Sequence, residues 1–202
     1  MMENLKPLGK KWAAQVTLAD CNDDELLKRA REAGCLYLFV GLESFSPSAL
    51  RRVNKGFNRV DSYRDITQKL HKHKIMIQAG IVFGFDEDTP ATFQDTLAAC
   101  EELGIDGVTV SLLTPLPRTP VYAGMKQEQR LLSEDWSLYN GKTDVVFHPR
   151  NMTSEQLFEG YLDFRRRFYS LPSFIRRRMR VSRTHLFYNF IINLGYRLAH
   201  KR

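Results

Sequence analysis

The chain has few cysteines, no long apolar run and no leader-like start, and each of these absences excludes a class of protein. Three cysteines in 202 residues are too few for a disulfide-stabilised scaffold. The sequence contains no run of 18 apolar residues, so no helix that spans a membrane is predicted. Because the first residues do not follow the pattern of a secretory signal, we expect a reducing, cytoplasmic compartment.

Acidic residues are missing from the C-terminal part of the chain. Between Arg165 and Arg202 there are eleven basic residues and no Asp or Glu, whereas the whole chain has a net charge of +7. The basic character therefore belongs to a tail and not to the body of the protein. Such a tail favours an anionic partner, which can be nucleic acid, phospholipid headgroups or an acidic protein surface.

The first two-thirds of the chain alternate buried-strand and helix patterns. Apolar runs predict strands at 12–18, 36–42, 75–85 and 107–113. The helices between them are predicted to begin at Asn22 (a capping box with Glu25), at Ser46-Pro47, at Tyr63 and at Thr89-Pro90. The last of these helices is predicted to end at Gly104. This alternation predicts an α/β fold with about four parallel βα units, in which the first strand is an exposed edge. We therefore expect the isolated chain to dimerise, aggregate or be of low stability.

After Thr114 the pattern changes. The stretch TPLPRTP predicts an extended loop. Thr153 with Gln156 predicts a second capping box that opens a helix to about Tyr169, and one or two further helices are predicted from Ser173 to Arg202. We therefore divide the chain into a βα portion (1–120) and a mostly helical extension with a basic tail (121–202).

Ligands of parallel βα folds bind at the carboxyl ends of the strands, and this rule selects the candidate site. Glu43 and Ser44 follow the second strand, where a carboxylate can accept hydrogen bonds from ribose hydroxyls; alternatively, Glu43 pairs with a basic residue and Ser44 caps the next helix. Gly80 and Gly84 lie in the third strand, and glycine there indicates either a flat ligand lying on the backbone or a bulge.

The other reactive side chains form no recognisable centre. The acidic run from Asp86 to Asp88 favours helix capping over metal binding. The three cysteines have no CxxC spacing, so no metal ligand set is predicted and no catalytic residue is assigned. We expect Cys35 and Cys100 in the core, and His71 and His73 on a solvated helix face.

The C-terminal stretch Leu186–Leu198 is apolar almost all round and is flanked by arginines. Two interpretations stay open: a helix that lies in a membrane interface, or a terminal helix that packs on the domain with basic residues at its rim. The second is favoured. Nucleic-acid binding is not favoured, because basic and polar residues are not interleaved here.

Several segments, in one order, resemble the radical S-adenosylmethionine (radical SAM) enzymes, in particular the cobalamin-binding subgroup. The likeness covers about residues 8–180 and rests on WAAQVT, AGCLYLFVGLES, the pair Asn54-Lys55, GIVFGFDEDT, LTPLPRTP and WSLYNGKTDVVFHPRNMTSEQL. The resemblance implies a partial (βα)6 barrel, of which this chain is the third to sixth units followed by the C-terminal extension. It also implies S-adenosylmethionine, a 4Fe–4S cluster and cobalamin as cofactors of the complete enzyme.

The resemblance also assigns residues to the cofactor S-adenosylmethionine. Glu43 and Ser44 fall near its ribose and amino-acid part, and Lys55 is a weaker candidate for its carboxylate. The pattern GxIxGxxE places Gly80, Val82, Gly84 and Glu87 beside adenine, and the exit of the last strand adds Leu113, Thr114 and Pro115. At this exit Arg118 replaces a usual glycine, so it is strained if the position needs a positive φ.

The expected function is therefore that of the C-terminal part of a radical SAM enzyme, with methyl transfer to an unactivated carbon as one reaction. The CxxxCxxC loop that holds the cluster is not in this chain. The expected partners are an N-terminal cluster and cobalamin segment or a separate chain, and a small-molecule or lipid substrate. The alternative is a non-catalytic adaptor that binds through the half-barrel and the basic tail, which also allows a peripheral place at an anionic membrane.

Overall fold

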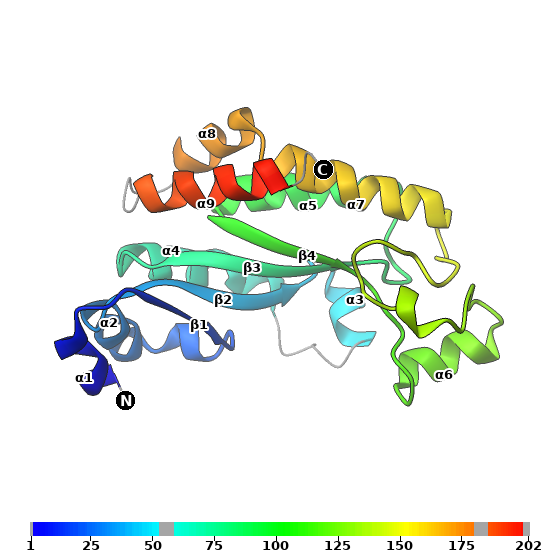
Figure 1. Cartoon of the computed structure of the whole chain (residues 1–202), viewed down its shortest axis with the longest axis horizontal. Helices are drawn as coiled ribbons and strands as arrows, with labels where there is room; N and C mark the ends of the chain where they lie inside the picture. Colours follow the sequence, from blue (N-terminus) through cyan, green and yellow to red (C-terminus); the bar gives the residue numbers. More distant parts are fainter. Residues whose placement is uncertain (1, 53–58, 180–185, 200–202) are drawn as a thin grey trace.

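Four parallel strands form one sheet at the centre of the protein (Figure 1). The computed structural model describes residues 2–52, 59–179 and 186–199. The strands are β1 (Trp12–Val16), β2 (Cys35–Glu43), β3 (Met76–Phe83) and β4 (Gly107–Leu112), and they neighbour one another in chain order. The predicted α/β class and its four βα units are confirmed.

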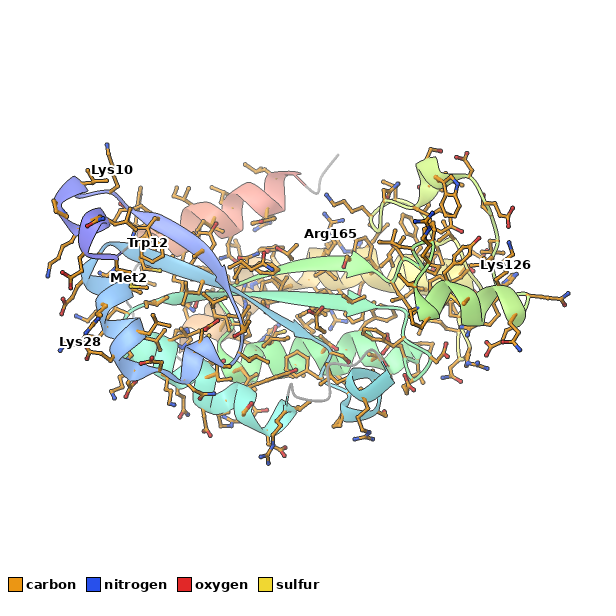
Figure 2. The ribbon with its side chains drawn as sticks, turned by 90° about the horizontal axis from the view of Figure 1, so that it is seen from below. Met2, Lys10, Trp12, Lys28, Lys126 and Arg165 are labelled. Atoms are coloured by element: carbon orange, nitrogen blue, oxygen red, sulfur yellow. The ribbon has the colours of Figure 1, made fainter. Side chains whose placement is uncertain are left out.

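Helices cover one face of the sheet and leave much of the other open. On β2 the side chains of Leu38, Val40 and Leu42 are buried under the helices, whereas Tyr37 and Phe39 on the opposite face are only half-buried. Figure 2 shows the covering helices α2 (Asp24–Glu32), α4 (Tyr63–Lys72) and α5 (Pro90–Leu103) on the same side of the sheet. We call the opposite side the open face; it carries Ala13, Gln15, Tyr37, Phe39, Gly41, Gln78, Gly80, Val82, Thr109 and Ser111.

Local signals set most helix ends, with one correction. Thr89 caps α5 and Gly104, with a φ of 68°, ends it, as predicted. The cap of α2 is Asp23, whose carboxylate accepts a hydrogen bond from the Leu26 amide; the predicted Asn22–Glu25 box is wrong by one residue, because Asn22 lies in a short 3-10 helix (Asp20–Asn22). The predicted helix at Ser46-Pro47 is α3 (Pro47–Arg52), and an additional short helix, α1 (Met2–Leu5), precedes the sheet.

The C-terminal extension is mostly helical, as predicted. It contains α6 (Pro120–Gln127), α7 (Ser154–Phe168) with the Thr153–Gln156 capping box, α8 (Leu171–Met179) and α9 (Leu186–Ala199). Helix α7 packs against α5, where the Phe93 ring fills the space in which a side chain at Gly160 would lie. Apolar residues of the extension therefore continue the core under the sheet. The boundary at residue 120 stays a prediction.

Strand β1 is an edge of the described sheet, since it pairs only with β2 there. Its open-face residues Ala13 and Gln15 are exposed. An unpaired strand edge is a template for another strand. The predicted self-association through this edge stays a prediction.

A buried polar cluster joins α8 and α9 to the amino-terminal ends of strands β3 and β4. The Asp106 carboxylate accepts hydrogen bonds from the Ile77 amide, from Arg178 and from Asn189, and it pairs with His71 Nε2 at 2.9 Å. Burial acts to raise the pKa of Asp106, but the bond from His71 and the nearby positive charges hold it below its ordinary value. The Arg177 guanidinium is fully buried beside it.

This cluster corrects the expectation that the two histidines lie on a solvated face. His71 is largely buried against Asp106, and His73 Nε2 lies 2.8 Å from Asp24 Oδ1 with only 16% of its side chain exposed. The pattern HKHK is as polar as a typical exposed helix turn. It does not indicate the acidic partners Asp106 and Asp24, because they lie 35 and 49 residues away in the sequence.

Candidate functional site

Glu43 ends β2 in a conformation that folds its carboxylate back onto the open face. Its φ is 67°, and the register between β2 and β3 shifts between Gly41 and Glu43. A Cβ atom added at Gly41 would lie only 2.6 Å from Glu43 Oε1. The absence of a side chain at Gly41 therefore makes room for the carboxylate, which lies on the face where the ligand is expected.

Ser44 stabilises the turn before α3 but does not cap the helix, because the Ala49 amide donates to Ser46 Oγ instead. The Ser44 side chain is buried, and its Oγ accepts a hydrogen bond from the Ser46 amide at the entrance to α3. The Tyr63 hydroxyl donates to the Leu42 carbonyl at 2.7 Å and supports the same turn. These contacts fix the turn that carries Glu43.

Gly80 lies beside Gly41 in the β2–β3 register, so two bare backbone positions are adjacent on the open face. The Phe39 ring lies on Gly80, because a Cβ atom added there would meet the ring at 2.8 Å. Val82, the next residue of the open face on β3, is half-buried. The stretch of backbone expected to receive a flat ligand is thus covered by an aromatic ring of the same chain.

The turn after β3 is closed by Asp88. Gly84 has a φ of 110°, and a Cβ atom there would lie 3.0–3.2 Å from Phe147, Leu157 and Leu113. The Asp88 carboxylate accepts hydrogen bonds from the amides of Gly84 and Phe85, at 2.8 and 3.0 Å. Burial raises the pKa of Asp88 to about 6 in spite of these two bonds.

The exit from β4 continues the same edge of the sheet. The Leu113 amide donates to the Phe83 carbonyl at 2.7 Å, and the Thr114 hydroxyl donates to the Leu112 carbonyl. Pro115 is buried. Arg118 has a φ of 66°, so the position that a glycine was expected to occupy is in the left-handed region. The structure therefore brings Glu43, Gly80, Val82, Gly84, Glu87 and Leu113–Pro115 to one end of the sheet, while Lys55 lies outside the described residues.

Four charged residues beside this edge form a closed ring that the sequence did not indicate. Asp86 pairs with Arg130 and Arg150 at 2.7 and 2.8 Å, and Glu128 pairs with the same two arginines at 3.1 and 2.6 Å. Burial acts to raise the pKa of Asp86, but the two arginines hold this pKa below its ordinary value. Residues separated by up to 64 positions make these pairs, so no local pattern could have predicted them.

Part of this ring lines a cavity of about 190 Å³ between the β3–α5 turn and α6. Its apolar wall comes from Phe85, Leu113, Val121 and Met125. A second cavity, of about 350 Å³, lies between α9 and the open face and is lined by Tyr37, Gln78, Ile191, Ile192, Gly195 and Tyr196. One mainly apolar cavity therefore lies beside the strand ends, and another lies beside the open face.

The described residues do not fit a metal cluster. They contain no group of three or more His, Cys, Asp or Glu side chains that could hold a metal ion. Cys21, Cys35 and Cys100 are all buried, and burial raises the pKa of each thiol to about 12. Cys21 follows β1 but lies in the core rather than at the candidate site, as do Cys35 and Cys100. Since thiolates are the ligands of iron–sulfur clusters, no step through a cluster is assigned to this chain.

Four parallel strands joined by helices make the chain a portion of a parallel βα fold. The comparison with solved structures agrees. The radical SAM methyltransferase TsrM from Kitasatospora setae, solved with cobalamin and a 4Fe–4S cluster bound, superposes with a TM-score of 0.54 at 16% identity, over 63% of this chain and 27% of TsrM.

Sequence relatives define the family more closely, although no family model matches the chain. The chain is 34% identical over 177 residues to the bacteriochlorophyllide d C-12(1)-methyltransferase of Chlorobaculum tepidum, which covers 88% of this chain and 38% of that enzyme. It is 31% identical over 135 residues to the hopanoid C-2 methylase of Rhodopseudomonas palustris, covering 67% and 25%. The chain spans well under half the length of these relatives. It belongs to the radical SAM superfamily, in its cobalamin-binding subgroup.

Proposed function

We propose that this chain supplies the adenosyl-binding half of a cobalamin-type radical SAM enzyme that transfers a methyl group to carbon. The observation that carries the proposal is the pair Gly41–Gly80, two adjacent positions without side chains on the open face, with the Glu43 carboxylate folded beside Gly41. Once the Phe39 ring that covers Gly80 rotates away, a flat adenine ring can approach the backbone, and the carboxylate can accept hydrogen bonds from ribose hydroxyls.

The chain's own residues bind and orient in this proposal. Glu43 holds the ribose, Val82 and the Leu113–Pro115 exit border the adenine, and Asp88 keeps the β3–α5 turn in place below it. When bound and reductively cleaved, S-adenosylmethionine supplies a 5′-deoxyadenosyl radical. The described residues contain no group of three or more His, Cys, Asp or Glu side chains that could hold a 4Fe–4S cluster, and we propose that another segment or a separate chain holds the cluster and cobalamin.

We further propose that the substrate is apolar. The 350 Å³ cavity on the open face is lined mainly by aliphatic and aromatic side chains, and its volume is within the range of small-molecule sites. The relatives act, by their names, on a bacteriochlorophyllide and a hopanoid. A large apolar substrate would enter this cavity with one polar group near Gln78.

Two matched glycine variants test the cofactor site. The full product of the gene, reconstituted anaerobically with iron and sulfide, is assayed for release of 5′-deoxyadenosine from S-adenosylmethionine. Gly80→Val and Gly107→Val each force one side chain of the open face to move, that of Phe39 and that of Gln78 respectively. Only the first blocks the proposed adenosyl surface, so we expect it to raise the KM for S-adenosylmethionine by about tenfold or more, a loss of roughly 1.4 kcal/mol.

Equal KM values for the two variants would contradict the assignment of Gly80. If the folded wild-type protein releases no 5′-deoxyadenosine, the proposal that it is an enzyme is wrong, and the non-catalytic adaptor becomes the proposed function.

A second pair of glycines tests the substrate cavity. Gly195 lines it and Gly124 lines the other cavity, and a Cβ atom at either would meet nothing within 4 Å. Gly195→Phe should therefore fill the larger cavity without disturbing its helix. We expect it to weaken the binding of an apolar porphyrin or sterol probe while Gly124→Phe does not; the reverse pattern moves the substrate to the cavity at the strand ends.

A further inference from the structure

Helix α9 is amphipathic in the opposite sense to an ordinary surface helix. Its two asparagines, Asn189 and Asn193, are 1% and 5% exposed. Four large apolar residues at spacings of four, three and four lie on the other side: Phe187, Ile191, Leu194 and Leu198, which are 71%, 49%, 36% and 56% exposed. We call these four residues the α9 stripe.

Hydrogen bonds of the polar side hold the stripe outward. Asn189 Nδ2 donates to the Asp106 carboxylate, Asn193 Nδ2 donates to the Asp106 carbonyl at 3.1 Å, and Arg177 donates to Asn193 Oδ1 at 2.9 Å. Tyr196 stacks on Tyr169 with ring centroids 4.9 Å apart. Rotating the helix to bury the stripe would strand these buried polar groups, which is costly.

The stripe also points away from the place where further strands would pair. Figure 2 shows α9 across the sheet from α2, α4 and α5. Its asparagine side contacts Met76 and Asp106 at the amino-terminal ends of β3 and β4, so Phe187, Leu194 and Leu198 face away from the sheet. Ile191, at the margin of the stripe, also lines the cavity between α9 and the open face. A strand added beside β1 would lie at the sheet edge and leave the stripe uncovered.

The charge near α9 helps to decide which kind of partner covers the stripe. The chain from Arg165 to its end contains eleven basic residues and no acidic one. Arg177 of this segment is buried and Arg178 is largely buried beside Asp106, and Arg176 pairs with Glu101, whereas Arg197 belongs to α9 itself. A second copy placed on the stripe would bring two such basic segments together, which like-charge repulsion disfavours. Nucleic acid would satisfy the charge but leave the four apolar side chains without a partner.

We propose that the α9 stripe docks on an anionic lipid bilayer. The helix lies in the interface, its apolar side in the acyl boundary and its basic surroundings at the headgroups, as interfacial amphipathic helices do. Among the described residues no helix is both long and apolar enough to cross a membrane. With 14 residues, α9 is about 21 Å long, shorter than the roughly 30 Å hydrocarbon layer. This docking is independent of the proposed enzymatic function.

Vesicle co-sedimentation of the full chain tests the proposal. The vesicles contain phosphatidylcholine with or without phosphatidylglycerol. The stripe variant is Phe187→Ser, Leu194→Ser and Leu198→Ser together, which leaves Ile191 in the wall of the open-face cavity unchanged. The matched control changes Leu8, Leu116 and Leu132 to Ser, three leucines on other elements that are 61%, 51% and 44% exposed. Both variants leave the charge unchanged.

We expect wild type and control to bind the phosphatidylglycerol vesicles, more weakly as salt increases, and the stripe variant to bind at least about tenfold more weakly. A reporter variant, Phe187→Trp, should show a blue-shifted emission only with these vesicles. Equal binding by both triple variants, no binding by wild type, or a wild-type dimer that only the stripe variant dissociates would each overturn the proposal.

Discussion

Replacing Arg177 by alanine should destabilise the fold far more than the same change at the adjacent Arg176. The Arg177 guanidinium is fully buried and donates to the carbonyls of Ile105 and Asp106 at 2.8 and 3.0 Å, to that of Phe168 at 2.9 Å and to Asn193 Oδ1 at 2.9 Å. It also lies 3.8 Å from the centre of the Phe168 ring. Burial lowers its pKa to about 10, so it remains charged at neutral pH.

The magnitude follows from what truncation leaves behind. Four buried acceptors each lose one donor, although the Asp106 carbonyl keeps the bond from Asn193, and the buried Asp106 carboxylate loses a neighbouring positive charge. Breaking a buried charged network by removing one member costs about 3–5 kcal/mol. For a chain of this size that corresponds to a fall in Tm of roughly 10 °C. Arg176 pairs with Glu101 but is 57% exposed, so its loss should cost at most about 1 kcal/mol.

Urea denaturation followed by circular dichroism measures both variants against wild type, with Arg177→Lys as a third. Lysine keeps the charge but cannot serve four acceptors from one planar group, so its stability should lie between wild type and Arg177→Ala. If Arg176→Ala and Arg177→Ala lose the same free energy of unfolding, the buried network does not hold α8 and α9 as described.

Three further outcomes are expected. Asp88→Asn should remove a pH dependence: since burial raises the folded-state pKa to about 6, wild-type stability falls as pH rises from about 4 to 6, by up to about 3 kcal/mol, and urea titrations of the variant should show no such fall. Arg118→Gly should stabilise by about 0.5–1 kcal/mol, because it relieves a φ of 66°, whereas Arg59→Gly, at a φ of −94°, should not; denaturant midpoints decide. Anaerobic reconstitution of this chain alone should give no stoichiometric 4Fe–4S cluster by iron and sulfide analysis; about four irons per chain, lost on replacing the three cysteines, would contradict this.

Local pattern predicted the sheet because each strand is a continuous apolar run. The strand LYLFVGL was recognised in this way, although only one of its faces is buried, since Tyr37 and Phe39 on the open face are half-buried. Gly104 was recognised as a helix end because a residue with positive φ favours glycine. Arg118 was expected to be strained only through the family resemblance. Its φ confirms the condition on which that expectation rested.

Features that depend on distant partners were not predictable in this way. The apolar composition of residues 186–198 favoured a helix packed on the domain, and α9 does pack there, but through its asparagines. Their burial depends on Asp106, which lies 83 residues before Asn189. The charge ring at Asp86 and the Phe39 ring on Gly80 have the same origin, since each joins residues on separate elements. The site residues themselves stay predictions, and the glycine variants above test them.

Because the Phe39 ring covers Gly80, the rate at which this ring moves can limit the rate of ligand binding there. A flat ligand reaches that backbone only in molecules whose ring has rotated away, so the apparent dissociation constant is the intrinsic one divided by the fraction of such molecules. Stopped-flow binding of S-adenosylmethionine should then reach a plateau in rate as ligand increases, set by the ring's own rotation. In Phe39→Ala the rate should rise linearly and the affinity should increase. Linear dependence in both proteins would mean that the ring does not act as a gate.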